Sequence, residues 1–184
     1  WAMRGTAFTR REPGFVDNVQ TGEDDVNEIE AEGGRLSALW RPVEDFSLKL
    51  SALAQESTAN GASVVEPGLG ELKQSFMDDT GVYERRTQAY SAHIAAKLGA
   101  VDFVSMTGYS VDRFLSSLDL TQVFGGFAQL FFNSPNSLYT IDQEIQKLSQ
   151  EIRFSAPIGE RFEWLLGGFY TDETINTHQE ITAV

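Results

Sequence analysis

The stretch RLSALWRPVEDFSLKLSALAQ at residues 35–55 alternates apolar and polar side chains on both sides of a short turn. From Phe46 onward every second side chain is apolar, and most of the side chains between are Ser, Lys or Gln. This period of two is typical of a half-buried β-strand, and residues 35–41 repeat it. Residues 42–45 read Pro-Val-Glu-Asp, which is a turn composition. The stretch therefore predicts an antiparallel hairpin.

Two further hairpins and one earlier strand follow the same design. Both rows of side chains are apolar in residues 101–112 and 162–171, so the register and the faces of these two segments stay open. The patterns predict about seven strands, at residues 5–10, 35–41, 46–55, 87–98, 103–113, 148–155 and 162–171.

The connections between these strands alternate strictly between short and long. The short ones are residues 42–45, 99–102 and 157–161, and the long ones are residues 12–32, 57–84 and 115–146. In an up-and-down sheet all the long connections lie at one end. Transmembrane β-barrels have this asymmetry, although soluble sandwiches and lipocalin-like barrels can also have uneven loops.

Charge follows the same division of the chain. Residues 12–32, 56–84 and 115–146 hold 17 acidic residues and one basic residue, whereas the rest of the chain holds 10 acidic and 13 basic residues. The formal net charge of -13 makes nucleic acid an improbable partner.

The uncharged run at residues 120–141 contains Gly, Asn and Pro, which disfavours a membrane-spanning helix. If the protein lies in a membrane, it crosses with strands.

Catalytic and metal-binding motifs are not visible. The chain has no cysteine, and its two histidines, His93 and His178, stand 85 residues apart. No HExxH motif or Gly-rich phosphate loop is present. The best enzyme alternative is a rim hydrolase using His178 with Asp172 or Glu173. We expect no catalytic site, no cofactor and no metal site.

Three segments resemble TonB-dependent outer-membrane receptors. They are GRLSALWRPVEDFSLKLSAL at residues 34–53, SQEIRFSAP at 149–157 followed by RFEWLLGGFY at 161–170, and GFVDNV at 14–19. The resemblance implies an all-β protein of antiparallel up-and-down strands. It implies that residues 1–184 are a segment of a transmembrane β-barrel, about seven to eight strands, with short periplasmic turns and long extracellular loops.

The resemblance also implies a function and a location. Members of this family lie in the outer membrane of Gram-negative cells and use TonB to take up a scarce ligand, such as a siderophore, a carbohydrate or an aromatic compound. The implied partners are outer-membrane lipid, the remainder of the barrel and its plug domain, the TonB complex and a small-molecule ligand. We expect the plug domain and the N-terminal region that contacts TonB to lie outside this chain.

Two alternatives remain open. The first is a complete small outer-membrane barrel with a structural or adhesive role, although the end of the chain at Val184 is not the aromatic residue usual in the family. The second is a soluble β-barrel binding protein, in which the apolar rows form a core.

Candidate site residues follow from these patterns. The polar rows would face the lumen or the plug if the apolar rows face lipid, and they include Arg35, Arg41, Lys49, His93, Lys97, Glu151 and Arg153. An aromatic loop would contact an apolar or ring-bearing ligand, or else pack on itself; it holds Phe124, Phe127, Phe131, Phe132 and Tyr139. The acidic clusters at residues 23–25 and 78–79 would bind divalent cations or remain solvated.

Overall fold

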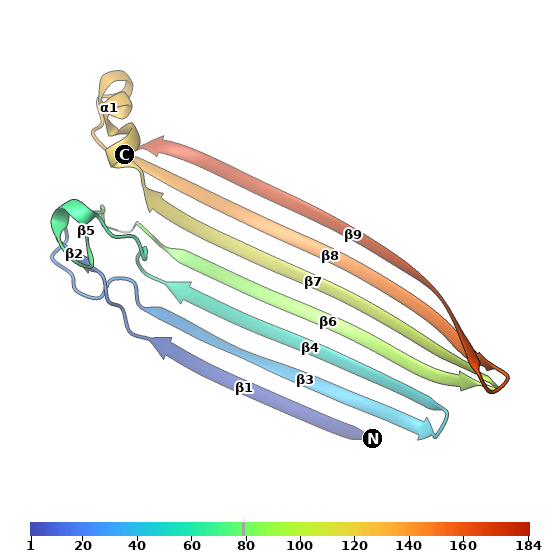
Figure 1. Ribbon diagram of the computed structural model, residues 1–184. Helices are drawn as coiled ribbons and strands as arrows, with labels where there is room; N and C mark the ends of the chain where they lie inside the picture. The colour runs from blue at the N-terminus through green and yellow to red at the C-terminus, as the bar shows by residue number, and fades with distance from the viewer. Residues whose placement is uncertain (79) are drawn as a thin grey trace.

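A computed structural model describes residues 1–78 and 80–184. Seven strands form one antiparallel sheet, in which each strand pairs with its neighbour in the chain (Figure 1). They are β1 (Ala2–Glu12), β3 (Ile29–Val43), β4 (Phe46–Ala59), β6 (Tyr83–Leu98), β7 (Val101–Asp119), β8 (Ser137–Ile158) and β9 (Phe162–Ala183). The expected all-β, up-and-down architecture is confirmed.

The strands are longer than the sequence patterns predicted. β8 has 22 residues, whereas alternation marked only residues 148–155. The added residues lie at the end of the sheet that bears the long loops. There both faces carry polar side chains, as in Thr140, Asp142 and Gln143, so the period of two disappears while the backbone pairing continues.

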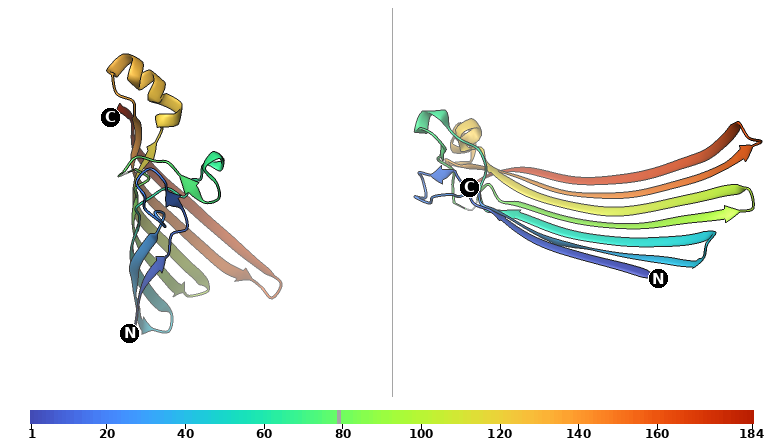
Figure 2. Two further views of the ribbon diagram at one scale, coloured as in Figure 1. Left: turned by 90° about the vertical axis from the view of Figure 1, so that its left-hand side faces the viewer. Right: turned by 60° about the horizontal axis from the view of Figure 1, so that its bottom comes forward.

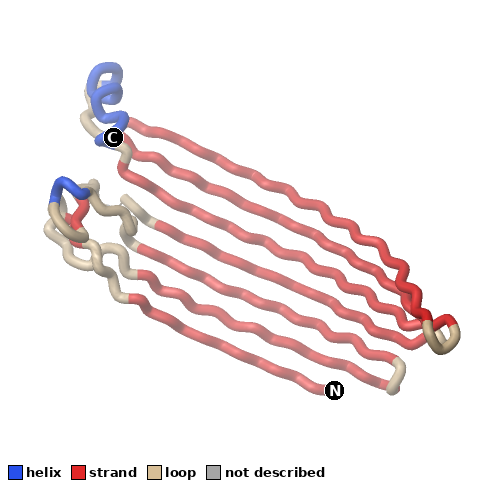
Figure 3. Tube along the Cα trace, viewed as in Figure 1, coloured by secondary structure: helices blue, strands red, loops and turns tan. Residues whose placement is uncertain are grey.

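Turns and loops divide between the two ends of the sheet, as Figure 3 shows. At the turn end the connections are residues 44–45, 99–100 and 159–161. Gly99 and Gly159 adopt left-handed φ values of 68° and 66°, which glycine tolerates and which tight turns need. At the loop end the connections are residues 13–28, 60–82 and 120–136. The predicted alternation of short and long connections is therefore confirmed.

Two of the long loops pack against each other. β2 (Asp17–Asn18) and β5 (Lys73–Gln74) form a small parallel sheet, and a 3₁₀ turn, η1 (Pro67–Leu69), lies nearby. Asn27 is 2% exposed, and its Oδ1 accepts the N–H groups of Phe15 at 2.7 Å and Val16 at 2.9 Å. Buried polar groups of this kind fix loop geometry because each has a partner. The two loops therefore form one folded unit.

The third long connection contains a helix that the sequence patterns did not predict. Residues Thr121–Phe132 form α1, which stands beyond the ends of β7 and β8 (Figure 1). The helix ends at Asn133, whose φ of 54° is left-handed, and Pro135 follows. A Cβ on Gly125 would lie 2.5 Å from the carbonyl oxygen of Pro135, so this glycine lets the helix pack closely on the returning chain.

The sheet is a single curved layer, as the two views in Figure 2 show. Its two outer strands, β1 and β9, do not pair with each other in the part of the chain that the structure describes, so the sheet is open. Few apolar side chains of the described residues are buried: Val16, Ala31, Ala59, Phe76, Ala128 and Ala156. Among the described residues, no helix is both long enough and apolar enough to cross a membrane.

Candidate functional site

The strand register separates the sheet into two faces. Residues directly opposite each other in antiparallel strands project from the same side. Lys49 on β4 lies opposite His93 on β6, His93 opposite Met106 on β7, and Met106 opposite Glu151 on β8. We call the side that carries this row the polar face.

Most of the predicted lumenal residues lie on this polar face. The alternation of side chains along each strand places Arg35, Lys49, His93, Lys97, Glu151 and Arg153 there. Arg41 lies within the register shift between Trp40 and Val43, so the pairing does not assign it to a row.

Ion pairs compensate several charges on the polar face. Lys147 Nζ lies 2.9 Å from Glu173 Oε2, and Arg153 pairs with Glu151. Nearer the loop end, Arg85 Nε lies 3.1 Å from Asp112 Oδ1. The hydrogen bond and the charge of Asp112 raise the pKa of Arg85 above its ordinary value. Sequence analysis missed the Arg85 pair, because strand register decides which charges meet.

The opposite face carries an apolar band. On β8 the band includes every second residue from Leu148 to Ile158, apart from Gln150. Ten residue steps cover about 34 Å along a strand, and a tilt of about 45° reduces this to about 24 Å of height. Transmembrane barrels expose an apolar band about 25 Å tall. The apolar band therefore has the height that lipid requires.

The strand register also shows that the strands are tilted relative to the apolar band. At the side nearest the loops, the last residue of the apolar band is Ala54 on β4 and Tyr170 on β9. Tyr170 lies in the row of Leu50, four residues nearer the turns than Ala54. A band that shifts steadily across the strands is expected when strands cross a layer at an angle. This register also resolves the faces of residues 101–112 and 162–171, which alternation had left open.

Aromatic side chains border the apolar band at both edges. Toward the loops, Tyr90 lies directly opposite Tyr109. Toward the turns, Trp40 and Phe46 lie at the turn ends of β3 and β4, and the centroids of their rings are 5.7 Å apart. Aromatic girdles at both interfaces accompany the apolar band of transmembrane barrels. The outward face thus has the layering of a membrane wall.

Beyond the upper girdle the same face becomes charged. Arg86 Nε lies 2.9 Å from Glu56 Oε1, and Arg113 Nε lies 2.6 Å from Glu144 Oε2. Hydrogen bonds from Gln146 and Arg113 lower the pKa of Glu144. These pairs lie outside the apolar band, where water can reach them.

Four of the five aromatic residues predicted to contact a ligand lie on helix α1. Phe124, Phe127, Phe131 and Phe132 lie on it, and the rings of Phe127 and Phe131 stack with centroids 6.4 Å apart. Their expected placement in an irregular loop is therefore corrected to a helix. Tyr139 is separate, since it lies on β8 opposite Leu118 on the polar face.

Helix α1 lies well beyond the apolar band. β7 continues ten residues past Tyr109, which is about 24 Å of height above the upper girdle at a tilt of about 45°. The rings on α1 are therefore clear of the apolar band, and three of them are largely exposed. Phe127, Phe131 and Phe132 are 64%, 68% and 73% exposed.

A groove separates the base of α1 from the loop at residues 60–82. It encloses about 740 Å³ and is lined mainly by apolar side chains such as Phe76, Met77 and Val123. The N–H of Met77 donates to Asp119 Oδ2 at 2.8 Å, and Gln122 donates to Glu66, so the two walls are joined. Sequence analysis missed this groove, because its walls come from two loops that alternation does not describe.

The remaining predictions from the sequence concern a hydrolase site at His178 and cation binding by two acidic clusters. His178 on β9 lies 3.8 Å from Glu180. Asp172 and Glu173 are six and five residues from His178, about 20 and 17 Å along the strand, so neither predicted partner lies within hydrogen-bond distance of it. Among the described residues, no three acidic or histidine side chains gather closely enough to hold a metal ion. In the cluster at residues 78–79, Asp79 lies outside the described residues.

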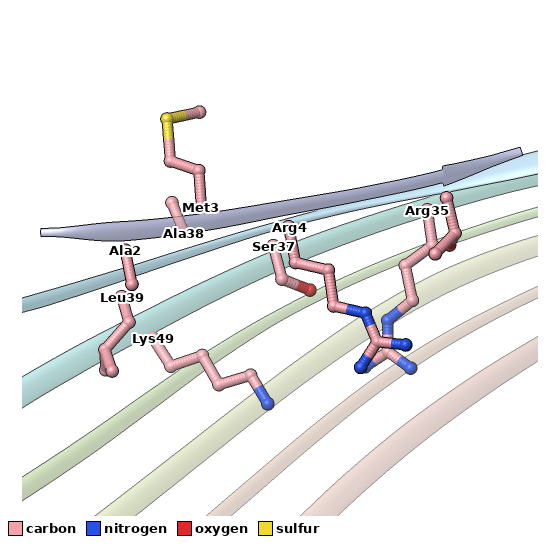
Figure 4. A pocket seen from close by; sticks show the side chains of 9 residues that line it. Ala2, Met3, Arg4, Arg35, Ser37, Ala38, Leu39 and Lys49 are labelled. Atoms are coloured by element: carbon pink, nitrogen blue, oxygen red, sulfur yellow. The ribbon is translucent and has the colours of Figure 1, made fainter.

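A hollow at the edge of the polar face carries three cations. It encloses about 380 Å³ and includes Arg4, Arg35 and Lys49. Figure 4 shows these three side chains pointing to one side of the sheet, while Met3 and Ala38 point to the other. We call this cluster the basic hollow. Arg4 was missed by the sequence analysis, because only residues 5–10 were assigned to the first strand.

The architecture and the two faces give the chain the fold of a segment of a transmembrane β-barrel, with an open sheet. A solved structure has the same fold: that of the ferric yersiniabactin uptake receptor FyuA from Yersinia pestis, with a TM-score of 0.77 and 14% sequence identity. The match covers 98% of this chain and 28% of that receptor chain. The resemblance to a barrel region of TonB-dependent receptors is thereby confirmed for the fold. Neither a protein-family model nor a curated protein sequence matches the chain.

Proposed function

We propose that residues 1–184 form part of the wall and outer loops of an outer-membrane receptor that imports a scarce small-molecule ligand with energy from the TonB complex. One observation carries the proposal: a polar face lies opposite an apolar band of about 24 Å that aromatic girdles border on both edges. A soluble sheet has no need for such layering, since its apolar face would meet a second layer of protein.

Each surface then has a partner. The apolar band contacts outer-membrane lipid, and the polar face faces the lumen and the plug domain. The free edges of β1 and β9 pair with the rest of the barrel, because an unpaired edge in lipid leaves backbone groups without hydrogen bonds. The open sheet also favours a segment of a large barrel over a complete small one.

The ligand contacts lie at the loop end, which is the extracellular end. The exposed rings of α1 offer stacking surfaces to a siderophore, a carbohydrate or an aromatic compound, and Tyr139 lies lower on the lumenal wall. Because the receptor with the same fold takes up ferric yersiniabactin, a ferric siderophore is the first ligand to try.

The receptor proposal is tested by fractionating the source cells and blotting with an antibody against residues 20–32. We expect an outer-membrane band several times heavier than 20.4 kDa. An outer-membrane band near 20.4 kDa would instead identify a small self-contained barrel. A soluble band would remove the membrane from the proposal.

The ligand surface is tested in the full-length receptor by uptake of radiolabelled ferric yersiniabactin, other ferric siderophores, oligosaccharides and aromatic compounds. We expect one of these to enter only in cells that have TonB, and the double variant Phe127→Ala/Phe131→Ala to lower its uptake about tenfold. Phe15→Ala is the matched control, because Phe15 is an exposed ring on another loop. Equal uptake by the double variant and the control would reject α1 as the ligand surface.

A further inference from the structure

The groove at the base of α1 has walls that hydrogen bonds hold together. Figure 1 shows α1 and η1 at the same end of the sheet. Gln122 on α1 donates to Glu66, the residue that precedes η1. Glu66 Oε1 also accepts the N–H of Ser75 at 2.7 Å. The groove is therefore preformed, and its volume of about 740 Å³ suits a small molecule.

The groove adjoins the loop end of the polar face. Leu118 lines it, and Leu118 lies opposite Tyr139 in a row of that face. Phe76, Met77 and Val123 add apolar surface around it. Apolar walls of this kind hold a ring by removing it from water. In a receptor that imports from the loop end, a ligand meets this groove before it reaches the lumen.

Two carboxylates in the groove have no cation beside them. Oδ1 and Oδ2 of Asp119 accept the N–H groups of Thr121 and Met77, each at 2.8 Å. Glu66 likewise accepts from an N–H group and from the amide of Gln122. Neither acid forms an ion pair within the part of the chain that the structure describes. Because all four donors are neutral, they fix the carboxylates in place and leave the negative charge of each to act on the groove.

The positive charges of the chain lie elsewhere. The three long loops of the structure hold nine acidic residues and one base, Lys73. Lys73 is not among the described residues that line the groove. Arg85, on the polar face of β6, is paired with Asp112, which lies six residues nearer the turns than Leu118. The basic hollow lies farther still toward the turns. The groove therefore combines apolar walls with a negative potential.

We propose that this groove selects a small molecule that carries both an apolar ring and a net positive charge. The ring packs on Phe76 and Val123, and the positive charge lies toward Glu66 and Asp119. The acidic loops draw the same molecule from a distance, because a surface of one sign concentrates ions of the other. An anion of the same size is repelled. The inference rests on the proposed function, since it names the chemical class of the ligand that the receptor imports.

The test compares two dyes on the full-length receptor in nanodiscs of phosphatidylcholine, a lipid without net charge. Rhodamine 6G is a cation and fluorescein an anion, and both contain a xanthene ring. Empty nanodiscs measure how much of each dye binds to lipid. We expect fluorescence anisotropy to show that the receptor binds rhodamine 6G about tenfold more tightly than fluorescein. The preference should fall as the salt concentration rises from about 0.05 to 0.5 M, because salt screens the two charges.

Charge changes in the groove then test which residues carry the preference. Glu66→Gln removes one charge and keeps an acceptor for the Ser75 N–H, so we expect rhodamine 6G to bind about fivefold more weakly. The exchange variant Glu66→Gln/Gln122→Glu returns the charge to the same hydrogen bond and should restore the affinity to within about twofold. Glu71→Gln is the matched control, because Glu71 is an exposed acid on the same loop that does not line the groove. We expect it to change the affinity by less than about twofold.

Four results overturn the inference. They are equal or tighter binding of fluorescein, no binding of rhodamine 6G above that of empty nanodiscs, an unchanged affinity in Glu66→Gln, and a loss in Glu66→Gln that the exchange variant does not restore. Failure of import is a separate result, because binding in nanodiscs does not need TonB. Uptake that is the same with and without TonB for every compound tried would reject the proposed function and leave the charge preference of the groove in place.

Discussion

A single charge on the apolar band should distinguish the two faces of the sheet. Ile152 lies near the middle of the band on β8, opposite Ser105 and Gly168, and is 38% exposed. Full burial of an Ile side chain contributes about 1.5–3 kcal/mol, so the exposed part facing lipid contributes about 0.6–1.1 kcal/mol. An arginine at the midplane of a barrel's lipid face costs about 2–4 kcal/mol. We expect Ile152→Arg to lower the free energy of unfolding by about 3–5 kcal/mol in total.

The matched control lies three residues away on the same strand. Ser149→Arg puts the same side chain on the polar face, opposite Gly108 and Thr171, where we expect a change within about 0.5 kcal/mol. The assay is equilibrium unfolding of the full-length receptor in lipid vesicles by guanidinium chloride, followed by tryptophan fluorescence. The slope of the unfolding free energy against denaturant concentration must be the same in the two variants. The difference between their midpoints then reports a difference in stability alone.

The pair of variants can refute the assignment of the faces. Equal losses at the two positions would mean that neither side is a water-filled lumen. A larger loss for Ser149→Arg would reverse the faces. Tolerance of Ile152→Arg would remove the apolar band from the membrane.

Three further predictions follow from named contacts. Asn27→Ala removes a buried acceptor of two N–H groups, so residues 13–28 should become sensitive to protease at a local cost of about 1–3 kcal/mol, while the unfolding midpoint of the barrel stays unchanged. Hydrogen bonds from Gln146 and Arg113 hold the pKa of Glu144 below its ordinary 4.5, so its contribution to stability is present above pH 4.5 and is lost as the pH falls through the lower folded value. A pH titration of unfolding in which Glu144→Gln shows the same acid loss as the unaltered receptor would contradict this. Trp164 lies opposite Ala156 on the apolar face, close to the turn end of β9. Kept as the only tryptophan of the receptor, it should be quenched more by lipids brominated near the headgroup than by lipids brominated mid-chain.

The alternation of apolar and polar side chains predicted the part of each strand that carries the apolar band. Only there do the two faces of the sheet meet different environments. Residues 46–55 show this directly, since apolar and polar side chains alternate as far as Gln55. Above that level both faces of the strands are polar, as at Glu56 and Ser57, and no periodic signal remains. The true strand ends therefore could not be predicted from the pattern.

The candidate site depended on features that lie outside single strands. The polar rows of β4, β6 and β8 were correctly grouped, because alternation within a strand fixes which residues share a face. Arg4 was missed because only residues 5–10 were assigned to the first strand, and the Arg85–Asp112 pair was missed because it depends on the register between two strands. Helix α1 was missed because Gly125 and Gly126 interrupt an apolar run that has no charged residue to mark a solvent side.

The pairing of the two N-terminal long loops has a consequence for engineering. Asn18 Nδ2 donates to the carbonyl oxygen of Phe76 at 2.9 Å, and the N–H of Asp17 donates to the carbonyl oxygen of Leu72 at 2.9 Å. A graft that replaces one loop alone would strip the other of its hydrogen-bond partners. Residues 13–28 and 60–82 should therefore be exchanged between receptors as one cassette, with epitope tags inserted only at a tip such as Gly68, where an added side chain meets open space.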